Sequence, residues 1–167
     1  SYGPLLFVLR ASDCRPPKPS HGPRVTKVRY QAFTAGNFAE NGYVAWCEES
    51  SQCVVVDPGA GAPQMIAAIE TEGSEVAAIL LTHAHLDHVE GLGAIREFTD
   101  AATYLHAADR ALFDAVPEQA AMFGLTAPSL APPEKELSDG ELFRFGESAF
   151  RVIHTPGHSP GHVILVA

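Results

Sequence analysis

The stretch T-H-A-H-L-D-H, residues 82–88, places three histidines and an aspartate within seven positions of a chain of 167 residues that holds eight histidines in all. So dense a cluster is improbable by chance. It directly follows residues 76–81, an apolar run that predicts a buried strand. Open α/β sheets build their sites at the carboxyl ends of such strands, so the sequence predicts a functional site here.

The polar side chains of this stretch have the chemistry of metal ligands. His83 and His85 flank Ala84 and can point toward one place from an extended loop, while Asp87 and His88 lie at the start of the next helix. Two imidazoles and a separate carboxylate and imidazole pair can hold two divalent ions, each with an open position for water. We therefore predict a metal site rather than scattered polar residues.

A second signal is T-P-G-H-S-P-G-H at residues 155–162. Its prolines and glycines restrict the backbone, which is one way to hold a ligand on a loop. His158 is the favoured ligand here. His154 and His162 lie on the flanking strands, and we expect each to be structural or to support a ligand.

Asp57 closes an apolar run at residues 53–57, before Pro58 and Gly59. One interpretation is a turn cap, in which the carboxylate accepts backbone hydrogen bonds. The other is a carboxylate that holds the outer nitrogen of a metal-binding histidine. The sequence leaves both open.

Alternating strand and helix patterns followed by paired strands predict an α/β domain built in layers. We expect one domain at residues 25–167, preceded by a Pro-rich, disordered or non-native extension at residues 1–24, for which a targeting peptide is the alternative. The expected strands are residues 27–33, 42–48, 53–57, 76–81, 103–105, 141–145, 149–154 and 163–166, and the expected helices are residues 63–73, 89–98 and 108–116, with loop from Pro117.

Charge and composition exclude several classes of protein. From Tyr30 onward the chain has five basic and nineteen acidic residues, which disfavours nucleic-acid binding. No apolar run approaches the roughly 20 residues that span a bilayer. Three cysteines without metal-binding spacing fit a reducing compartment, so we expect a cytoplasmic protein. The oligomeric state stays open.

Three motifs in this order, V-V-V-D-P-G at residues 54–59, T-H-A-H-L-D-H and T-P-G-H-S-P-G-H, resemble the metallo-β-lactamase-fold hydrolases, and most of all their glyoxalase II-like branch. The resemblance covers about residues 30–167. It implies a four-layer αββα sandwich. The chain stops within an apolar run, and we expect the C-terminal part of that sandwich to be missing.

The resemblance also implies roles for single residues. His83, His85 and His158 would bind a first metal, Asp87 and His88 a second, and Asp57 would support a ligand. Zinc, two ions per complete site, is the expected metal, with iron or manganese possible. The family's bridging aspartate and last histidine have no counterpart here, so we expect weakened or single metal occupancy and impaired activity of this chain.

The implied reaction is hydrolysis of a small-molecule thioester of glutathione, or of a related acyl ester. A metal-bound hydroxide would attack the acyl carbonyl, and Asp87 would orient this nucleophile and shuttle its proton. A mononuclear iron persulfide dioxygenase on the same fold is one alternative. A non-catalytic metal-binding fragment is another.

Overall fold

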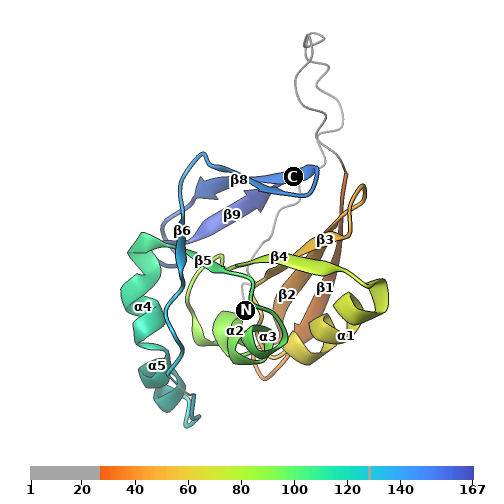
Figure 1. Cartoon of the computed structure of the whole chain (residues 1–167). Coiled ribbons are helices and arrows are strands. Elements are labelled where there is room, and N and C mark those ends of the chain that lie inside the picture. The colour runs from red at the N-terminus through yellow and green to blue at the C-terminus, as the bar shows by residue number, and fades with distance from the viewer. Residues whose placement is uncertain (1–26, 128) are drawn as a thin grey trace.

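The structure is a computed structural model that describes residues 27–127 and 129–167. The extension predicted at residues 1–24 lies outside the described residues. Two β-sheets and one layer of helices make up the described chain (Figure 1).

The larger sheet has six strands in sequence order. Its first three strands pair antiparallel, and from β3 onward the strands pair parallel. Four of the five residues of β3 are buried, as are the last three of β4, which is the pattern of strands covered on both faces. The strands are β1 (Val28–Ala35), β2 (Glu40–Cys47), β3 (Gln52–Val56), β4 (Glu75–Leu80), β5 (Thr103–His106) and β6 (Lys135–Leu137).

The smaller sheet has three antiparallel strands, β7 (Leu142–Phe145), β8 (Ser148–His154) and β9 (Val163–Val166). β7 and β8 form the predicted hairpin about Gly146, whose φ of 52° suits glycine. The backbone N–H of Val163 donates to the carbonyl oxygen of Thr82 at 2.9 Å. This bond joins the start of β9 to the segment that follows β4.

The helices contribute buried residues to one core cluster only, which also includes one face of the six-stranded sheet. A second cluster fills the space between the two sheets. The described residues thus form three layers, with α1, α2 and α3 on one side of the larger sheet and β8 and β9 on the other (Figure 1). The helices are α1 (Ala62–Glu72), α2 (Leu86–Val89), α3 (Leu92–Phe98), α4 (Arg110–Asp114) and α5 (Val116–Met122), with a 3-10 turn η1 (Ala107–Asp109) before α4.

This mixed architecture confirms the predicted α/β class, and of the four layers expected, the described residues supply a helical layer and two sheets. Three details differ from the prediction. The second helix begins at Leu86 instead of residue 89, and it is divided from α3 at Glu90 and Gly91. Pro117 does not end the helical region, since α5 starts at Val116 and a proline fits the first turn of a helix. β6 was not predicted, because only Leu137 of its three residues is buried and apolar.

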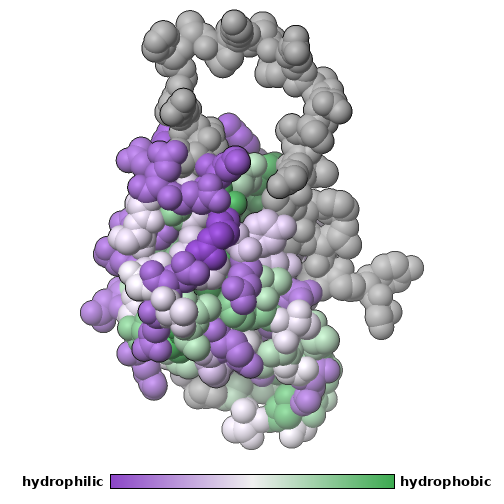
Figure 2. Space-filling view, turned by 90° about the vertical axis from the view of Figure 1, so that its right-hand side faces the viewer, coloured by the Kyte–Doolittle hydropathy of each residue, from purple (hydrophilic) through white to green (hydrophobic). Residues whose placement is uncertain are grey.

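One face of the molecule mixes hydrophilic and apolar side chains without a strict separation (Figure 2). Among the described residues, none of the helices has the length and apolar character that crossing a bilayer requires.

Candidate metal centre

The histidine stretch lies where the sequence places it, beyond the carboxyl end of β4. β4 ends at Leu80, residues 81–85 have no regular secondary structure, and α2 begins at Leu86. His85 is the N-cap of α2 and has an extended backbone, with φ −73° and ψ 151°. The chain therefore passes from strand to helix within residues 82–88. For this reason the side chains of this stretch approach one centre from different directions.

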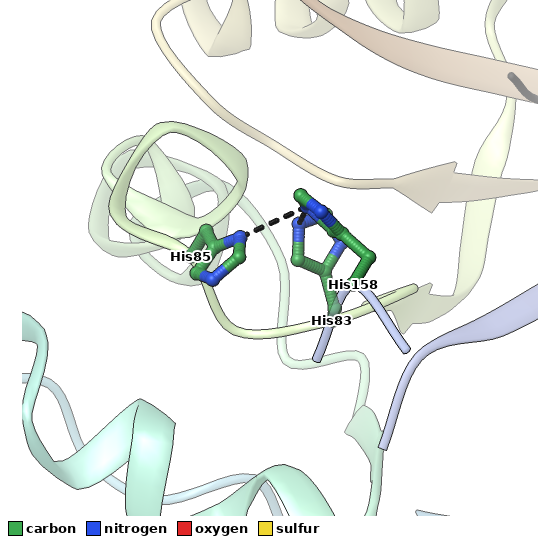
Figure 3. A group of neighbouring side chains, drawn as sticks. All are labelled: His83, His85 and His158. Atoms are coloured by element: carbon green, nitrogen blue, oxygen red, sulfur yellow. Dashed lines mark hydrogen bonds between the residues drawn. The ribbon is translucent and has the colours of Figure 1, made fainter. Parts of the chain in front are cut away.

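Three imidazoles converge at this centre, although His158 comes from the loop between β8 and β9 (Figure 3). Nε2 of His158 lies 3.1 Å from Nε2 of His83 and 3.0 Å from Nδ1 of His85. The side chain of Thr82 contacts the other nitrogen of His83, with 3.0 Å between Oγ1 and Nδ1. The Nε2 atom of His83 is thus left to face the other two rings.

This set of nitrogens fits a divalent metal. A neutral imidazole has one nitrogen with a proton and one with a lone pair, so Nε2 of His158 cannot donate to both of its neighbours. A tetrahedral ion with bonds of about 2.0–2.1 Å holds its ligand atoms about 3.3 Å apart. The separations of 3.0 and 3.1 Å between these nitrogens are close to that value. A metal satisfies all three lone pairs at once.

The environment favours the neutral form of two of these rings, which is the form that binds a metal. Burial lowers the pKa of His83, which has no exposed surface, and the neighbouring imidazoles lower it further. Burial and the ring of His158 also lower the pKa of His85. Their nitrogens are therefore available to a cation at neutral pH.

A second set of possible ligands lies beside the first. Nε2 of His88 is 3.8 Å from Oδ2 of Asp87, and its ring centroid is 4.1 Å from that of His83. The Nδ1 atom of His88, on the opposite side of the ring, lies 3.1 Å from Oδ2 of Asp57. Burial lowers the pKa of His88, but Asp57, together with the nearby carboxyl groups of Asp87 and Glu40, outweighs burial and raises the pKa of the ring. Asp57 thus holds His88 with Nε2 turned toward Asp87.

The contacts of Asp57 are compatible with both interpretations that the sequence left open. Its Oδ1 accepts a hydrogen bond of 2.7 Å from the backbone N–H of Thr82, and its Oδ2 accepts one of 2.5 Å from the Thr82 hydroxyl. Its φ of 48° lies in the left-handed region, which Asp and Asn adopt more readily than other non-glycine residues. Asp57 lies in the turn after β3, and its carboxylate contacts His88 directly. It also accepts from the Thr82 hydroxyl, which in turn contacts His83.

The family model described as "Metallo-beta-lactamase superfamily" matches residues 35–167 of this chain, which includes every residue of the two groups. The chain belongs to the metallo-β-lactamase superfamily. The match confirms the family expected from the three motifs.

Members of this superfamily with curated descriptions are similar over most of the described chain. The hydroxyacylglutathione hydrolase GloC of Haemophilus influenzae is 32% identical over 128 residues, or 75% of this chain and 60% of that protein. A probable metallo-hydrolase of Bacillus subtilis, YqgX, is 33% identical over 138 residues, or 81% of this chain and 64% of that protein. The chain spans about three fifths of the length of these relatives.

Solved structures of the superfamily agree with the fold. The crystal structure of TTHA1623 in a di-iron-bound form is 38% identical in sequence, with a TM-score of 0.70 over 81% of this chain and 65% of that one. The B3 metallo-β-lactamase BLEG-1 is 31% identical, with a TM-score of 0.73 over 82% of this chain and 66% of that one.

Asp109 was not predicted from the sequence, although it accepts hydrogen bonds from both loops that carry the converging histidines. Asp109 has no exposed surface. Its Oδ2 accepts hydrogen bonds from the backbone N–H of Ala84 at 3.0 Å and from the Ser159 hydroxyl at 2.7 Å. Its Oδ1 accepts one of 2.6 Å from the backbone N–H of Gly161. Ala84 lies between two of the converging histidines and Ser159 follows the third, so Asp109 fixes the two loops relative to each other.

The two flanking histidines take part in other contacts and belong to neither group of possible ligands within the described residues. Nε2 of His154 lies 2.9 Å from the carbonyl oxygen of Pro160, and its ring stacks on that of His106. Nδ1 of His162 lies 2.7 Å from the Thr155 hydroxyl. Both therefore brace the loop that carries His158.

A buried carboxyl group lies beneath the second group of ligands. Neither oxygen of Glu40, at the start of β2, has a hydrogen-bond partner among the described residues. A Cβ atom at Gly59 would meet Oε2 of Glu40 at 2.2 Å and the carbonyl oxygen of Asp87 at 2.0 Å. Burial raises the pKa of Glu40 to about 8, with His88 opposing and nearby carboxylates adding to the shift. Only glycine fits between Glu40 and the start of α2.

Proposed function

We propose that the protein is a metal-dependent hydrolase of small thioesters, such as those of glutathione, or of related acyl esters. The observation that carries the proposal is the convergence of His83, His85 and His158 at 3.0–3.1 Å, beside Asp87 and His88. The similarity to a protein named hydroxyacylglutathione hydrolase supports the substrate class.

In this proposal the three converging imidazoles hold one divalent ion, and Asp87 and His88 provide ligands for a second. Bound ions of this kind polarise an acyl carbonyl and lower the pKa of water toward neutrality. We favour zinc, because it accepts histidine and aspartate ligands readily. Iron is the principal alternative, since a relative that is 38% identical was solved with two irons.

The chain's own residues have separable tasks. Asp87 is partly exposed, with 26% of its side chain accessible, so it can reach both a ligand position and the substrate. Its carboxylate accepts a proton from the attacking water and passes it to the leaving group. Asp57 orients His88, and Asp109 keeps the loop of His158 in place. A thiolate leaving group needs little protonation, which suits thioesters.

The test is hydrolysis by purified protein reconstituted separately with zinc, iron and manganese. S-lactoylglutathione and a simple acyl ester are the substrates, and a β-lactam is included because one structural relative is a B3 metallo-β-lactamase. We expect metal-dependent release of thiol, lost in Asp87→Asn. Oxygen uptake with one iron per chain and no thioester hydrolysis would favour the persulfide dioxygenase instead. Metal binding without any turnover would favour the non-catalytic fragment.

We also propose that the protein works in the cytoplasm. Neither Cys47 nor Cys53, the two cysteines within the described residues, forms a disulfide. Recovery of the native protein outside the cytoplasm on cell fractionation would refute this location.

A further inference from the structure

A cavity of about 350 Å³ opens directly beside the metal centre. His85 and Asp87 form part of its lining, so a molecule that reaches the ligands also reaches the cavity. On one side lies the turn between β1 and β2, and on the other lie α4 and the end of α5. Its size is at the lower end of the range for small-molecule sites, about 300–1,000 Å³.

Apolar side chains make up most of the cavity wall. Phe38 and Phe123 come from opposite sides, and their rings meet edge to face with centroids 5.0 Å apart. Both are exposed, and Met122 beside them is 78% exposed. These three are half of the large apolar side chains that the described residues leave exposed. Their concentration at a single opening marks a binding surface rather than chance exposure.

Besides His85 and Asp87, the lining has one polar side chain, that of Gln119, and its amide is already hydrogen-bonded within the protein. Gln119 donates through Nε2 to the carbonyl oxygens of Ala84 and Leu112, at 3.0 and 2.9 Å. Its Oε1 accepts a hydrogen bond of 2.9 Å from the backbone N–H of Leu86. The amide thus ties α5 to the metal loop and has no N–H left for a ligand.

The charge of the lining disfavours an anionic group inside the cavity, away from the metal ligands. No Lys or Arg is among the lining residues, and Asp87 adds a negative charge. A glutathione group carries two carboxylates, which find no partner in such a wall. Of the two halves of a thioester, the acyl group is the one that fits.

We propose that this cavity binds the acyl group of the substrate and makes the enzyme selective for apolar acyl chains over short hydroxylated ones. The inference rests on the proposed hydrolase function and deepens it. With the carbonyl at the metal ligands, the acyl chain extends along the wall that the two touching rings of Phe38 and Phe123 form, and Leu112 and Met122 cover it. Each further methylene group of the acyl chain is transferred from water into contact with the apolar wall, which is favourable.

The experiment compares acetyl, butyryl and hexanoyl thioesters of one thiol, with the lactoyl thioester as the hydroxylated reference. We expect kcat/KM to rise by about two- to fourfold for each methylene added, because that is the effect of burying a methylene group. The lactoyl thioester should fall below the butyryl one. Equal rates along the series would overturn the proposal.

A variant pair locates the effect. Met122→Lys introduces a cation at an exposed cavity residue, and it should reduce the dependence on chain length. Leu142→Lys is the matched control, since Leu142 is also exposed, at 42%, but lies on β7 and outside the cavity. If Leu142→Lys changed the chain-length dependence as much as Met122→Lys, the cavity would not be the site.

A binding measurement separates this inference from the hydrolase proposal. Acetate, butyrate and hexanoate are titrated into the metal-loaded protein by calorimetry, which requires no turnover. Affinity that rises with chain length in the unmodified protein and not in Met122→Lys supports the cavity, even if every thioester proves inert. Affinity independent of chain length overturns the cavity, even if thioesters are hydrolysed.

Discussion

The carboxylate of Asp109 accepts a hydrogen bond of 2.6 Å from the backbone N–H of Gly161, a residue 52 positions later in the chain. The two backbones also approach closely, because a Cβ atom added at Gly161 would lie 2.7 Å from the backbone nitrogen of Asp109, so that only glycine fits there. The loop that carries His158 therefore packs against the 3-10 turn that follows β5. A buried carboxylate with three donors aimed at it has little freedom to move.

Asp109→Asn should lower metal affinity by about 10–100-fold and destabilise the fold. The amide keeps only one acceptor oxygen, so its N–H₂ group would face either the Gly161 N–H or the two donors that Oδ2 now accepts from. Metal affinity by competition with a chelator and the thermal midpoint of the metal-free protein check this. Asp100→Asn, at an exposed aspartate, is the control. Unchanged affinity in Asp109→Asn would contradict the positioning role.

Asp57→Asn should weaken the second metal more than the first. Asparagine tolerates the left-handed backbone at this position, so the turn is retained while the charge beside His88 is lost. We expect affinity at the Asp87 and His88 group to fall by about 10–100-fold. Titration with zinc while tryptic resistance is monitored would follow both events. Equal losses at both sites would show that Asp57 acts through the turn alone.

The group with three ligands should bind a metal ion more tightly than the group with two, and should therefore fill first. The first group offers three imidazoles within the described residues, and the proposed second site offers His88 and the partly exposed Asp87. We expect His158→Ala to remove the tightest binding event and His88→Ala to preserve it. Calorimetric titration with zinc distinguishes them, and loss of the tight event in both variants would contradict two separable sites.

The contribution of Glu40 to the stability of the metal-free protein should decrease as the pH rises from about 5 to about 8. The pKa of Glu40 is about 8 in the folded chain and 4.5 in the reference state, so the folded state binds the extra proton between these values. This contribution is fully present below pH 4.5 and is lost as the pH rises through 8. Glu40→Gln should remove it.

The measurement is the free energy of unfolding in denaturant, with a chelator present, for both proteins at several pH values. Histidines titrate in both proteins, so the difference between the curves isolates Glu40. A difference that does not change between pH 5 and pH 8 would show that the carboxyl group is ionised in the folded state.

How far the sequence predicts this centre depends on whether a residue acts within its own segment. His83, His85, Asp87 and His88 share one stretch after a buried strand, and this local pattern locates them. The contact between His158 and His83 spans 75 positions, and it was anticipated through the family resemblance rather than through spacing. Its geometry depends on how β8 and β9 lie against β4, which no local pattern contains.

Asp109 shows why the sequence did not predict the remaining features of the site. It stands in A-A-D-R-A-L, where an aspartate looks like an ordinary first-turn residue of a helix. Its function arises from donors 25, 50 and 52 positions away. Similarly, the short strand β6 exists because β5 offers it a parallel partner, and α5 continues past Pro117 because Val116 and Ala120 are buried in the core.

The backbone bond between Val163 and Thr82 joins the first residue of β9 to the segment of His83. Because of it, the loops that carry the ligands cannot separate unless the two sheets also part. Release of a metal and opening of the protein are therefore linked equilibria. At a free metal concentration 100 times its dissociation constant, an ion held here would add about 2.7 kcal/mol to the stability of the folded chain. Metal supply in the cell would then govern how long the protein survives, as well as how fast it works.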